Sequence, residues 1–187
     1  MKVRALDELP GVLIVEPDVH EDDRGFFLET WRHELYAEHG MDTLFVQDNR
    51  SRSEPGVLRG LHFQHPTPQA KLVYVTLGAI LDVIVDVRTG SPDFGRWAGV
   101  PLSAADHRQV FVPEGFAHGF AVTDGPAEII YKCGAPYRSE HERVLAWDDP
   151  DLAITWPIQR PALSDRDAAG MSLDALRSAG VLPTGRR

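Results

Sequence analysis

Hydrophobic and polar positions alternate along most of the chain in short runs, and this pattern predicts β-strands. The runs rich in β-branched or aromatic residues cover 11–17, 25–31, 56–63, 71–77, 79–88, 96–102, 109–113, 118–123 and 128–133. Turn-forming stretches such as EDDRG, HPTPQ, TGSPDFG and TDGP separate them. Short strands at near-regular spacing predict an all-β sandwich or barrel.

Two segments are better explained as short helices. The first runs from Trp31 to His39 and is ended by Gly40. The second runs from Leu173 to Ala179, with Ser172 as its N-cap and Gly180 just past its end. The tail, about 157–187, carries several prolines, and we expect it to wrap over the barrel rather than extend the sheet.

The strand AILDVIVDV shows the alternation most clearly. One face carries only aliphatic residues: Leu81, Val83, Val85 and Val87. The other face mixes isoleucine with aspartate: Ile80, Asp82, Ile84 and Asp86. This pattern fits a jelly roll whose aliphatic face packs in the core. Taken alone, the mixed face is more simply a solvent face; if it points inward, Asp82 is a buried carboxylate near the strand of His62.

Composition limits the classes of function. A chain of 187 residues with 43% hydrophobic residues is long and apolar enough for a single domain, which we expect over 1–187. Its net charge of -9 disfavours binding to nucleic acid or to an anionic membrane, although a local cluster of basic side chains can still hold a small anion. No apolar run approaches a membrane span, and the single cysteine, Cys133, cannot form an intrachain disulfide. We therefore expect a cytoplasmic protein.

The stretch GVLRGLHFQHPTPQAKL, at 56–72, concentrates polar side chains in what reads as a buried strand and its turn. Polar groups in a core cost free energy unless they are paired. A core histidine bonded to a backbone carbonyl would account for His62 alone. The whole set needs partners in one small volume, which favours a functional site: Arg59, His62, Gln64, Gln69 and Lys71.

A metal site is the weaker interpretation of this stretch. In metal-binding barrels of the cupin type, a H-x-H pair on one strand face often holds the ion. Here His62 and His65 are three apart, so a regular strand sends them to opposite faces, and His65 directly precedes Pro66. His118 is available, but no carboxylate completes the usual ligand set. We expect no metal.

An acid–base site fits the residues better. The pKa of a free histidine is about 6.5, which suits a general base at neutral pH. Orienting carboxylates are available at Asp82, Asp165 and Asp167, while Lys71 can stabilise an oxyanion and Tyr131 can serve as the acid. If Arg59 and His62 face one ligand, the strand must be irregular at Gly60 or Leu61.

An ordered set of motifs resembles a known family. The motifs are DRGFFLE at 23–29, QDN at 47–49, GVLRGLH at 56–62, DV and VD at 82–86, PEGFAHGF at 113–120 and YK at 131–132. Together they resemble the dTDP-4-dehydrorhamnose 3,5-epimerases, from about residue 8 to residue 170. LRGLH followed by PEGFAHGF at this spacing is highly specific.

The resemblance implies a cupin-type jelly roll, also called a double-stranded β-helix, with a few short peripheral helices. It implies no metal and no organic cofactor, and a homodimer in which a strand and aromatic side chains of one subunit complete the other's site. The implied substrate is a dTDP-4-keto-6-deoxyhexose in dTDP-rhamnose or related deoxysugar biosynthesis. The implied reaction inverts C3 and C5 by deprotonation next to the C4 ketone, through an enolate that is reprotonated from the opposite face.

The same resemblance assigns roles to individual residues. His62 is the base, Asp167 orients it, Tyr131 is the acid and Lys71 faces the enolate oxygen. The implied ligands of the substrate are Arg24, Arg59 and Arg166 for the diphosphate, Phe26 for the thymine, and Glu29, Gln47, Asn49, His118 and Glu142 for the nucleotide and sugar. The family commonly has lysine where this chain has Arg166, and arginine keeps the positive charge.

Structural alternatives exist for several of these assignments. Arg24 can be a turn arginine paired with its acidic neighbours, Tyr131 a core residue and Glu29 a surface residue. His118 can hold its own loop through a backbone bond, and Asp165 competes with Asp167. For the whole chain, the alternatives are a single-site epimerase at C3 or C5 from an antibiotic-sugar pathway, a non-catalytic sugar-nucleotide-binding cupin, and a metal-dependent cupin oxygenase.

Overall fold

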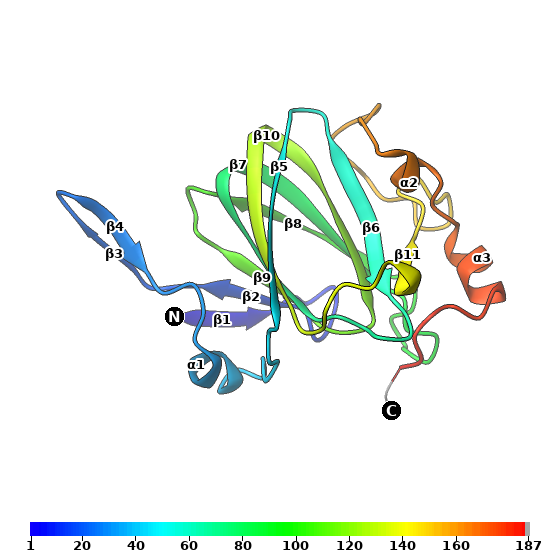
Figure 1. The fold of residues 1–187 in the computed structure, drawn as a ribbon, viewed down its shortest axis with the longest axis horizontal. Helices are drawn as coiled ribbons and strands as arrows, with labels where there is room; N and C mark the ends of the chain where they lie inside the picture. The colour runs from blue at the N-terminus through cyan, green and yellow to red at the C-terminus, as the bar shows by residue number, and fades with distance from the viewer. Residues whose placement is uncertain (186–187) are drawn as a thin grey trace.

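The computed structural model describes residues 1–185, and its main feature is a nine-stranded antiparallel sheet that closes on itself (Figure 1). The strand order is β1-β2-β9-β7-β10-β6-β11, with β5 paired to β10 and β8 paired to β7. The bounds of these strands are β1 Lys2–Ala5, β2 Leu13–Glu16, β5 Gln47–Ser53, β6 Leu58–Gln64, β7 Lys71–Asp86, β8 Trp97–Ser103, β9 Gln109–Val112, β10 Phe116–Cys133 and β11 Glu142–Val144.

Two long strands, β7 and β10, connect the two halves of the barrel. The first part of β7, from Lys71 to Tyr74, pairs with β9, while its second part pairs with β8. The first part of β10 pairs with β6, and its last residues, 127–133, pair with β5. The two halves of the nine-stranded sheet, joined by the bent strands β7 and β10, form a jelly roll. The predicted all-β, cupin-type fold is confirmed.

The prediction of two short strands in place of each of these long strands was wrong. One predicted strand ended at 77 and the next began at 79, and a turn was predicted at TDGP, 123–126, whereas β7 and β10 run through both places. The strands bend together there, with register shifts in β10 around Asp124. A Cβ on Gly78 would lie 2.5 Å from the Asp124 carbonyl oxygen, so glycine allows the two backbones to approach. The turn-like residues mark a bend rather than an end.

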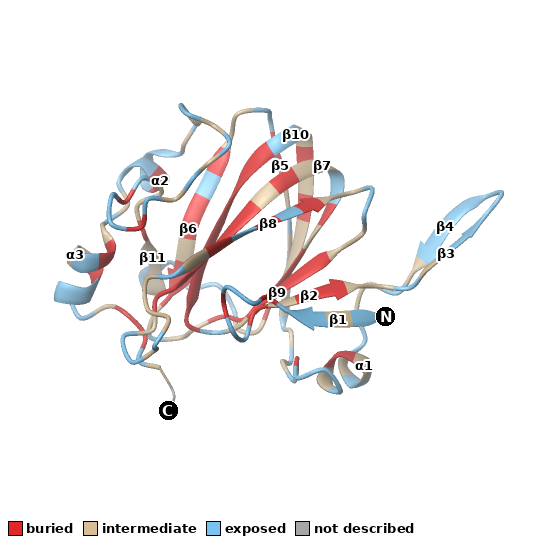
Figure 2. Ribbon diagram, turned by 180° about the vertical axis from the view of Figure 1, so that it is seen from behind, coloured by how far each residue is buried: buried red, intermediate tan, exposed pale blue. Residues whose placement is uncertain are grey.

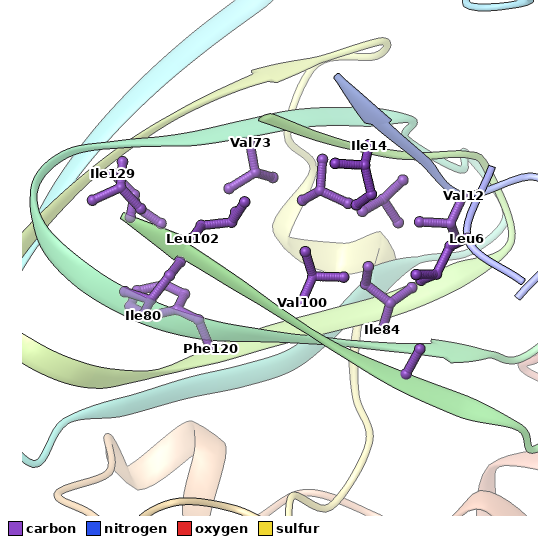
Figure 3. Packing of buried hydrophobic residues seen from close by; sticks show 14 of the residues in the cluster. Leu6, Val12, Ile14, Val73, Ile80, Ile84, Val100, Leu102, Phe120 and Ile129 are labelled. Atoms are coloured by element: carbon purple, nitrogen blue, oxygen red, sulfur yellow. The ribbon is translucent and has the colours of Figure 1, made fainter. Parts of the chain in front are cut away.

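The barrel interior is filled by aliphatic and aromatic side chains from both sheets (Figure 3). Ile80 and Ile84 are among them, so the mixed face of β7 points inward. Asp82 and Asp86, on the same face, are 0% exposed. The preference for a solvent face was therefore wrong.

The aliphatic face of β7 is buried as well, because the C-terminal part of the chain covers it. Leu152, Leu173, Leu176 and Leu182 pack in one cluster with Val83 and Val85 of β7 and with Val87, which directly follows the strand. Full burial of one such side chain contributes about 1.5–3 kcal/mol. Buried positions accordingly follow one another along 82–86 of β7 and 116–122 of β10, and the exposed residues of both strands lie next to their bend (Figure 2).

The helices are short and lie outside the barrel: α1 His33–Ala37, the 3-10 helix η1 Ser139–His141, α2 Asp165–Ala168 and α3 Leu173–Ser178. Helix α3 begins as predicted, with the Ser172 hydroxyl accepting from the amide of Ala175 at 3.2 Å. Helix α1 is shorter than predicted. Its Tyr36 is buried under β9, where its hydroxyl donates to Gln109 at 2.9 Å. Burial raises the pKa of Tyr36 to about 12.

Several elements were not predicted from the sequence: β1, β3, β5, β11 and α2. Strand β5, QDNRSRS, has no apolar alternation and is held by its pairing with β10. Strands β3 Val19–Asp22 and β4 Gly25–Leu28 form a separate two-stranded hairpin that extends away from the barrel (Figure 1). None of the helices within residues 1–185 has the length and apolarity needed to cross a membrane.

Candidate active site

A cavity of about 340 Å³ opens in the barrel between β5, β6 and β10. Residues far apart in the sequence meet in its wall. It is lined by most of the residues that the sequence analysis selected: Gln47, Asn49, Arg59, His62, Lys71, His118, Tyr131, Glu142 and Arg166. The wall also contains Gln64 and Gln69 of the polar stretch 56–72, to which no role was assigned. The remaining residues of the wall were not selected from the sequence: Ser51, Phe63, Gly119, Phe120, Ile129, Cys133 and Tyr137.

His62, on β6, is held from behind by Asp167 of α2. The Nε2 atom of His62 and the Oδ1 atom of Asp167 are 2.5 Å apart, and the carboxylate side chain is only 5% exposed. Burial acts to raise the pKa of the Asp167 carboxyl, but its hydrogen bonds with His62, Ser164 and the Gly60 backbone outweigh burial and lower that pKa. Because a carboxylate only accepts, Nε2 carries the hydrogen and Nδ1 keeps a free lone pair.

The predicted irregularity at Gly60 is confirmed. On β10, His118 pairs with His62 and Phe120 pairs with Arg59, so β6 holds one residue more than β10 over this interval. Gly60 has a φ of 114°, and a Cβ there would lie 2.6 Å from the Gly119 Cα atom. The extra residue turns the strand between Arg59 and His62, and both side chains line the cavity.

Lys71 begins β7 and lies in the cavity wall, where its residue is 8% exposed. Within residues 1–185, no hydrogen bond or ion pair occupies its ammonium group. Burial lowers the pKa of Lys71, while the nearby Cys133, Asp82 and Glu142 act in the opposite direction. In its cationic form, a lysine removed from water in this way can bind an anion that enters the cavity.

His118, on β10, is buried beside Asp82 of β7. The His118 Nδ1 atom lies 3.4 Å from the Asp82 Oδ2 atom. Burial and the neighbouring Lys71 lower the pKa of His118, so its ring is neutral near pH 7. The alternative in which His118 holds its loop through a backbone hydrogen bond is therefore not found within residues 1–185, where the ring contacts Asp82 instead.

Tyr131 and Cys133 lie two residues apart near the end of β10, on the side of the barrel that pairs with β5. Burial raises the pKa of Tyr131, which keeps its hydroxyl protonated at neutral pH. Burial likewise raises the pKa of the Cys133 thiol, which accepts a 3.5 Å hydrogen bond from the Asn49 amide. Both groups are therefore neutral.

A polar network forms the mouth of the cavity. Arg166 of α2 makes an ion pair with Glu142 of β11, and Tyr137 bonds to both of them, donating to the Glu142 carboxylate at 3.0 Å. The Tyr137 amide in turn donates to the Gln47 side chain at 2.8 Å. Tyr137 was missed because nothing in the local pattern of APYRSEHE separates it from an ordinary surface tyrosine; its place beside two selected residues appears only in the fold.

Three of the selected residues do not reach this cavity within one chain: Arg24, Phe26 and Glu29. Arg24 lies at the turn of the β3–β4 hairpin, 89% exposed and paired with Asp22 at 2.5 Å. Phe26 is 59% exposed and contacts His107 with the two rings tilted and their centroids 4.6 Å apart. Glu29 follows the hairpin and pairs with Arg32. In the single chain, Arg24 therefore has the turn pairing that was its structural alternative.

Comparison with known proteins identifies the family. The sequence model of the dTDP-4-dehydrorhamnose 3,5-epimerases matches residues 7–175. The chain belongs to this family. A dTDP-4-dehydrorhamnose 3,5-epimerase from Neisseria gonorrhoeae is 52% identical over 163 residues, which are 87% of this chain but 50% of that protein. Two further relatives of the same description are each covered over 91% of their own length.

Solved structures agree with this assignment. A dTDP-6-deoxy-D-glucose-3,5-epimerase from Legionella pneumophila, in complex with dTDP-4-keto-L-rhamnose, superimposes with a TM-score of 0.95 at 44% identity, over 100% of this chain and 99% of that one. ChmJ, a 3'-monoepimerase from Streptomyces bikiniensis in complex with dTDP-quinovose, gives 0.90 at 38% identity, over 96% and 92%. The predicted isomerase class and dTDP-sugar epimerase function are confirmed at the level of the family.

Proposed function

We propose that this protein inverts both C3 and C5 of a dTDP-4-keto-6-deoxyhexose, with His62 as the base and Tyr131 as the acid. The observation that carries this proposal is the cavity in which an Asp167-oriented histidine, a buried lysine and a protonated tyrosine meet. The C4 ketone acidifies the protons on its two neighbouring carbons. A base, an oxyanion partner and an acid are the groups that such an exchange needs.

In this mechanism, the His62 Nδ1 atom removes the proton from C3 or C5. The electron pair moves onto the C4 oxygen, and the ammonium group of Lys71 stabilises the resulting enolate. The imidazolium that forms is stabilised by Asp167, 2.5 Å from Nε2. Tyr131 then donates its hydroxyl proton to the carbon from the opposite side of the sugar ring.

The strand pairing supports opposite positions for the base and the acid. His62 belongs to the half of the barrel in which β6 pairs with the first part of β10. Tyr131 belongs to the other half, where the last part of β10 pairs with β5. A sugar ring held between the two halves would have one group on each face, and proton removal and return on different faces is what inverts a carbon.

Other cavity residues have the charge and position to hold the nucleotide. Arg59 and Arg166 are the guanidinium groups in the wall, and we propose that both contact the diphosphate. Because Arg166 is paired with Glu142 in the free protein, diphosphate would compete with that carboxylate. Gln47, Asn49, His118 and Glu142 supply the polar contacts to the sugar and base.

We further propose a homodimer in which the β3–β4 hairpin of one chain completes the cavity of the other. A two-stranded hairpin on its own is marginally stable, and this one exposes Phe26 and Phe27 at 59% and 70%. A second copy of the chain would cover these rings and would bring Arg24 and Phe26 to the nucleotide.

Subunit mixing tests the dimer. His62→Asn removes the base and Phe26→Ala removes a hairpin contact, so each variant alone should be inactive or weak. If the hairpin crosses to the partner, random mixing through unfolding and refolding should restore activity at about a quarter of all sites. Activity that stays at the sum of the two separate variants would exclude the exchange. A monomer in light scattering would exclude the dimer itself.

Solvent deuterium tests which carbons react. With dTDP-4-keto-6-deoxyglucose in deuterated buffer, NMR should show label at C3 and at C5. The 3'-monoepimerase ChmJ, at 38% identity, makes this test necessary. Label at one centre alone would replace the proposal with a single-site epimerase.

A second assay separates catalysis from binding. His62→Asn should retain dTDP binding and lose proton exchange, whereas unchanged exchange would exclude His62 as the base. The absence of exchange in the unaltered protein, with binding retained, would favour a sugar-nucleotide-binding protein.

We place the reaction in the cytoplasm, which is compatible with a chain that contains a single cysteine.

A further inference from the structure

Asp82 is a buried carboxylate for which the proposed mechanism has no role. It is 0% exposed, and its Oδ1 atom is the one buried side-chain nitrogen or oxygen within residues 1–185 that has no hydrogen-bond partner. An unpaired buried charge is costly, and an apolar residue of similar size is often the more stable choice. Its neighbours on this face, Ile80 and Ile84, are ordinary core residues (Figure 3). A buried carboxylate with one oxygen left unpaired lowers stability, so its presence here points to function.

The register of β7 and β10 places this carboxylate beside two residues of the cavity wall. Asp82 pairs with Phe120, and Ile84 pairs with His118. Asp82 and His118 are therefore diagonal neighbours on the inner face, with Asp82 Oδ2 3.4 Å from His118 Nδ1. His118 and Phe120 line the cavity, while Asp82 itself does not. Any effect of Asp82 on the ligand must pass through its neighbours.

One cavity-wall neighbour, His118, carries such an effect. The neutral ring of His118 has one hydrogen, and a carboxylate beside Nδ1 places that hydrogen on Nδ1, which leaves Nε2 as an acceptor.

We propose that Asp82 is a positioning residue of the epimerase site, which fixes His118 as an acceptor for a sugar hydroxyl. This inference rests on the proposed function. Asp82 touches neither the substrate nor the reacting atoms; it sets the hydrogen-bonding direction of His118 in the cavity wall.

Two substitutions of Asp82 test this role. Asp82→Leu removes both the acceptor and the charge. We expect its kcat to fall about 10- to 100-fold, the range for carboxylates that orient a functional histidine in other sites, with KM within about threefold. Asp82→Asn keeps an acceptor for the His118 hydrogen but loses the charge, so its kcat should fall less. Rescue of part of the rate by asparagine is not expected of a merely structural residue.

The matched control is Asp86→Asn, on the same strand and face. Asp86 is also 0% exposed, but its carboxylate is fully paired with Arg88, at 2.6 Å, and with Ser91. Its loss should lower Tm and leave the kcat of the folded protein unchanged. The comparison separates a destabilised barrel from a misdirected site.

Nitrogen NMR of ligand-free protein labelled at histidine gives a readout that needs no substrate. The unaltered protein and Asp82→Asn should have the hydrogen of His118 on Nδ1, and Asp82→Leu should move it toward Nε2. A kcat in Asp82→Asn as low as that in Asp82→Leu, or an unchanged tautomer and rate in Asp82→Leu, overturns the proposal. If the unaltered protein exchanges no substrate proton, the proposed function fails, while the tautomer still decides the role of Asp82 toward His118.

Discussion

The pair of His62 and Asp167 makes the sharpest prediction. Asp167→Asn keeps the shape of the side chain and a hydrogen-bond acceptor for Nε2, but it removes the negative charge that lies 2.5 Å from the ring. The ground state, with a neutral histidine, loses little. The imidazolium that forms after proton removal loses its counter-charge, so the effect should fall on kcat rather than on substrate binding.

The size of the effect follows from the geometry. A hydrogen bond to a charged group contributes about 1.5–3 kcal/mol, and His62 is 28% exposed, so water screens part of this interaction. Since about 1.4 kcal/mol corresponds to a tenfold change in rate, kcat should fall about 10- to 100-fold. The assay is the rate of deuterium uptake at C3 and C5 of the substrate, followed by NMR at saturating substrate.

The matched control is Asp165→Asn. Asp165 lies on the same short helix and carries the same charge, but it is exposed and has no contact with His62. It should leave the rate of deuterium uptake unchanged. Equal losses in the two variants would mean that general charge near α2 matters and not the pair. A full rate in Asp167→Asn would refute the orienting role of Asp167.

Three further predictions concern stability. Gly60→Ala places a Cβ 2.6 Å from the Gly119 Cα atom, at a backbone φ of 114°. This variant should lower the free energy of unfolding, measured by urea titration, by about 2 kcal/mol or more. The control Gly56→Ala, with a φ of 83° and open space around it, should lower that free energy less. Lys71→Met should raise that free energy, because a buried cation without a partner is lost, while kcat falls about 100-fold or more; a loss of stability would contradict the stated burial cost. The folded-state pKa of Asp167 is lowered from 3.8, so its pair with His62 stabilises the fold above about pH 4 and loses that effect as pH falls through the folded-state pKa. The difference in unfolding free energy between the unaltered protein and Asp167→Asn should therefore shrink in acid. A difference that does not depend on pH would contradict this prediction.

Much of the secondary structure follows from local features of the amino-acid sequence. The alternation in 79–88 gave a strand with two distinct faces, and Ser172 with Gly180 gave α3 nearly to the residue. The Gly60 bulge also followed from sequence, since two polar side chains three apart can share a ligand only if the strand deforms. These predictions succeeded because each depends on residues that are close together in the sequence.

The long-range features were decided by the tertiary structure. Alternation in β7 separates two faces but does not say which is inside. Both are buried here, one by the barrel and one by the C-terminal segment, so exposure could not be inferred from polarity. The bend at Gly78 resembles a turn locally. Only its pairing with β10, which bends at the same place, shows that the strand continues.

The site divides in the same way. The sequence by itself determined the chemical groups, because a histidine, a lysine, a tyrosine and an aspartate in these motifs match one family. The residue pattern left Asp82, Asp165 and Asp167 as possible partners of His62. Only the resemblance to the family selected Asp167, which is 105 residues away in sequence and contacts His62 in the fold. The sequence could not show that Arg24 and Phe26 lie outside the cavity of their own chain, or that one oxygen of Asp82 has no hydrogen-bond partner. Those facts depend on how distant strands pair, and the side chains become neighbours only when the barrel closes.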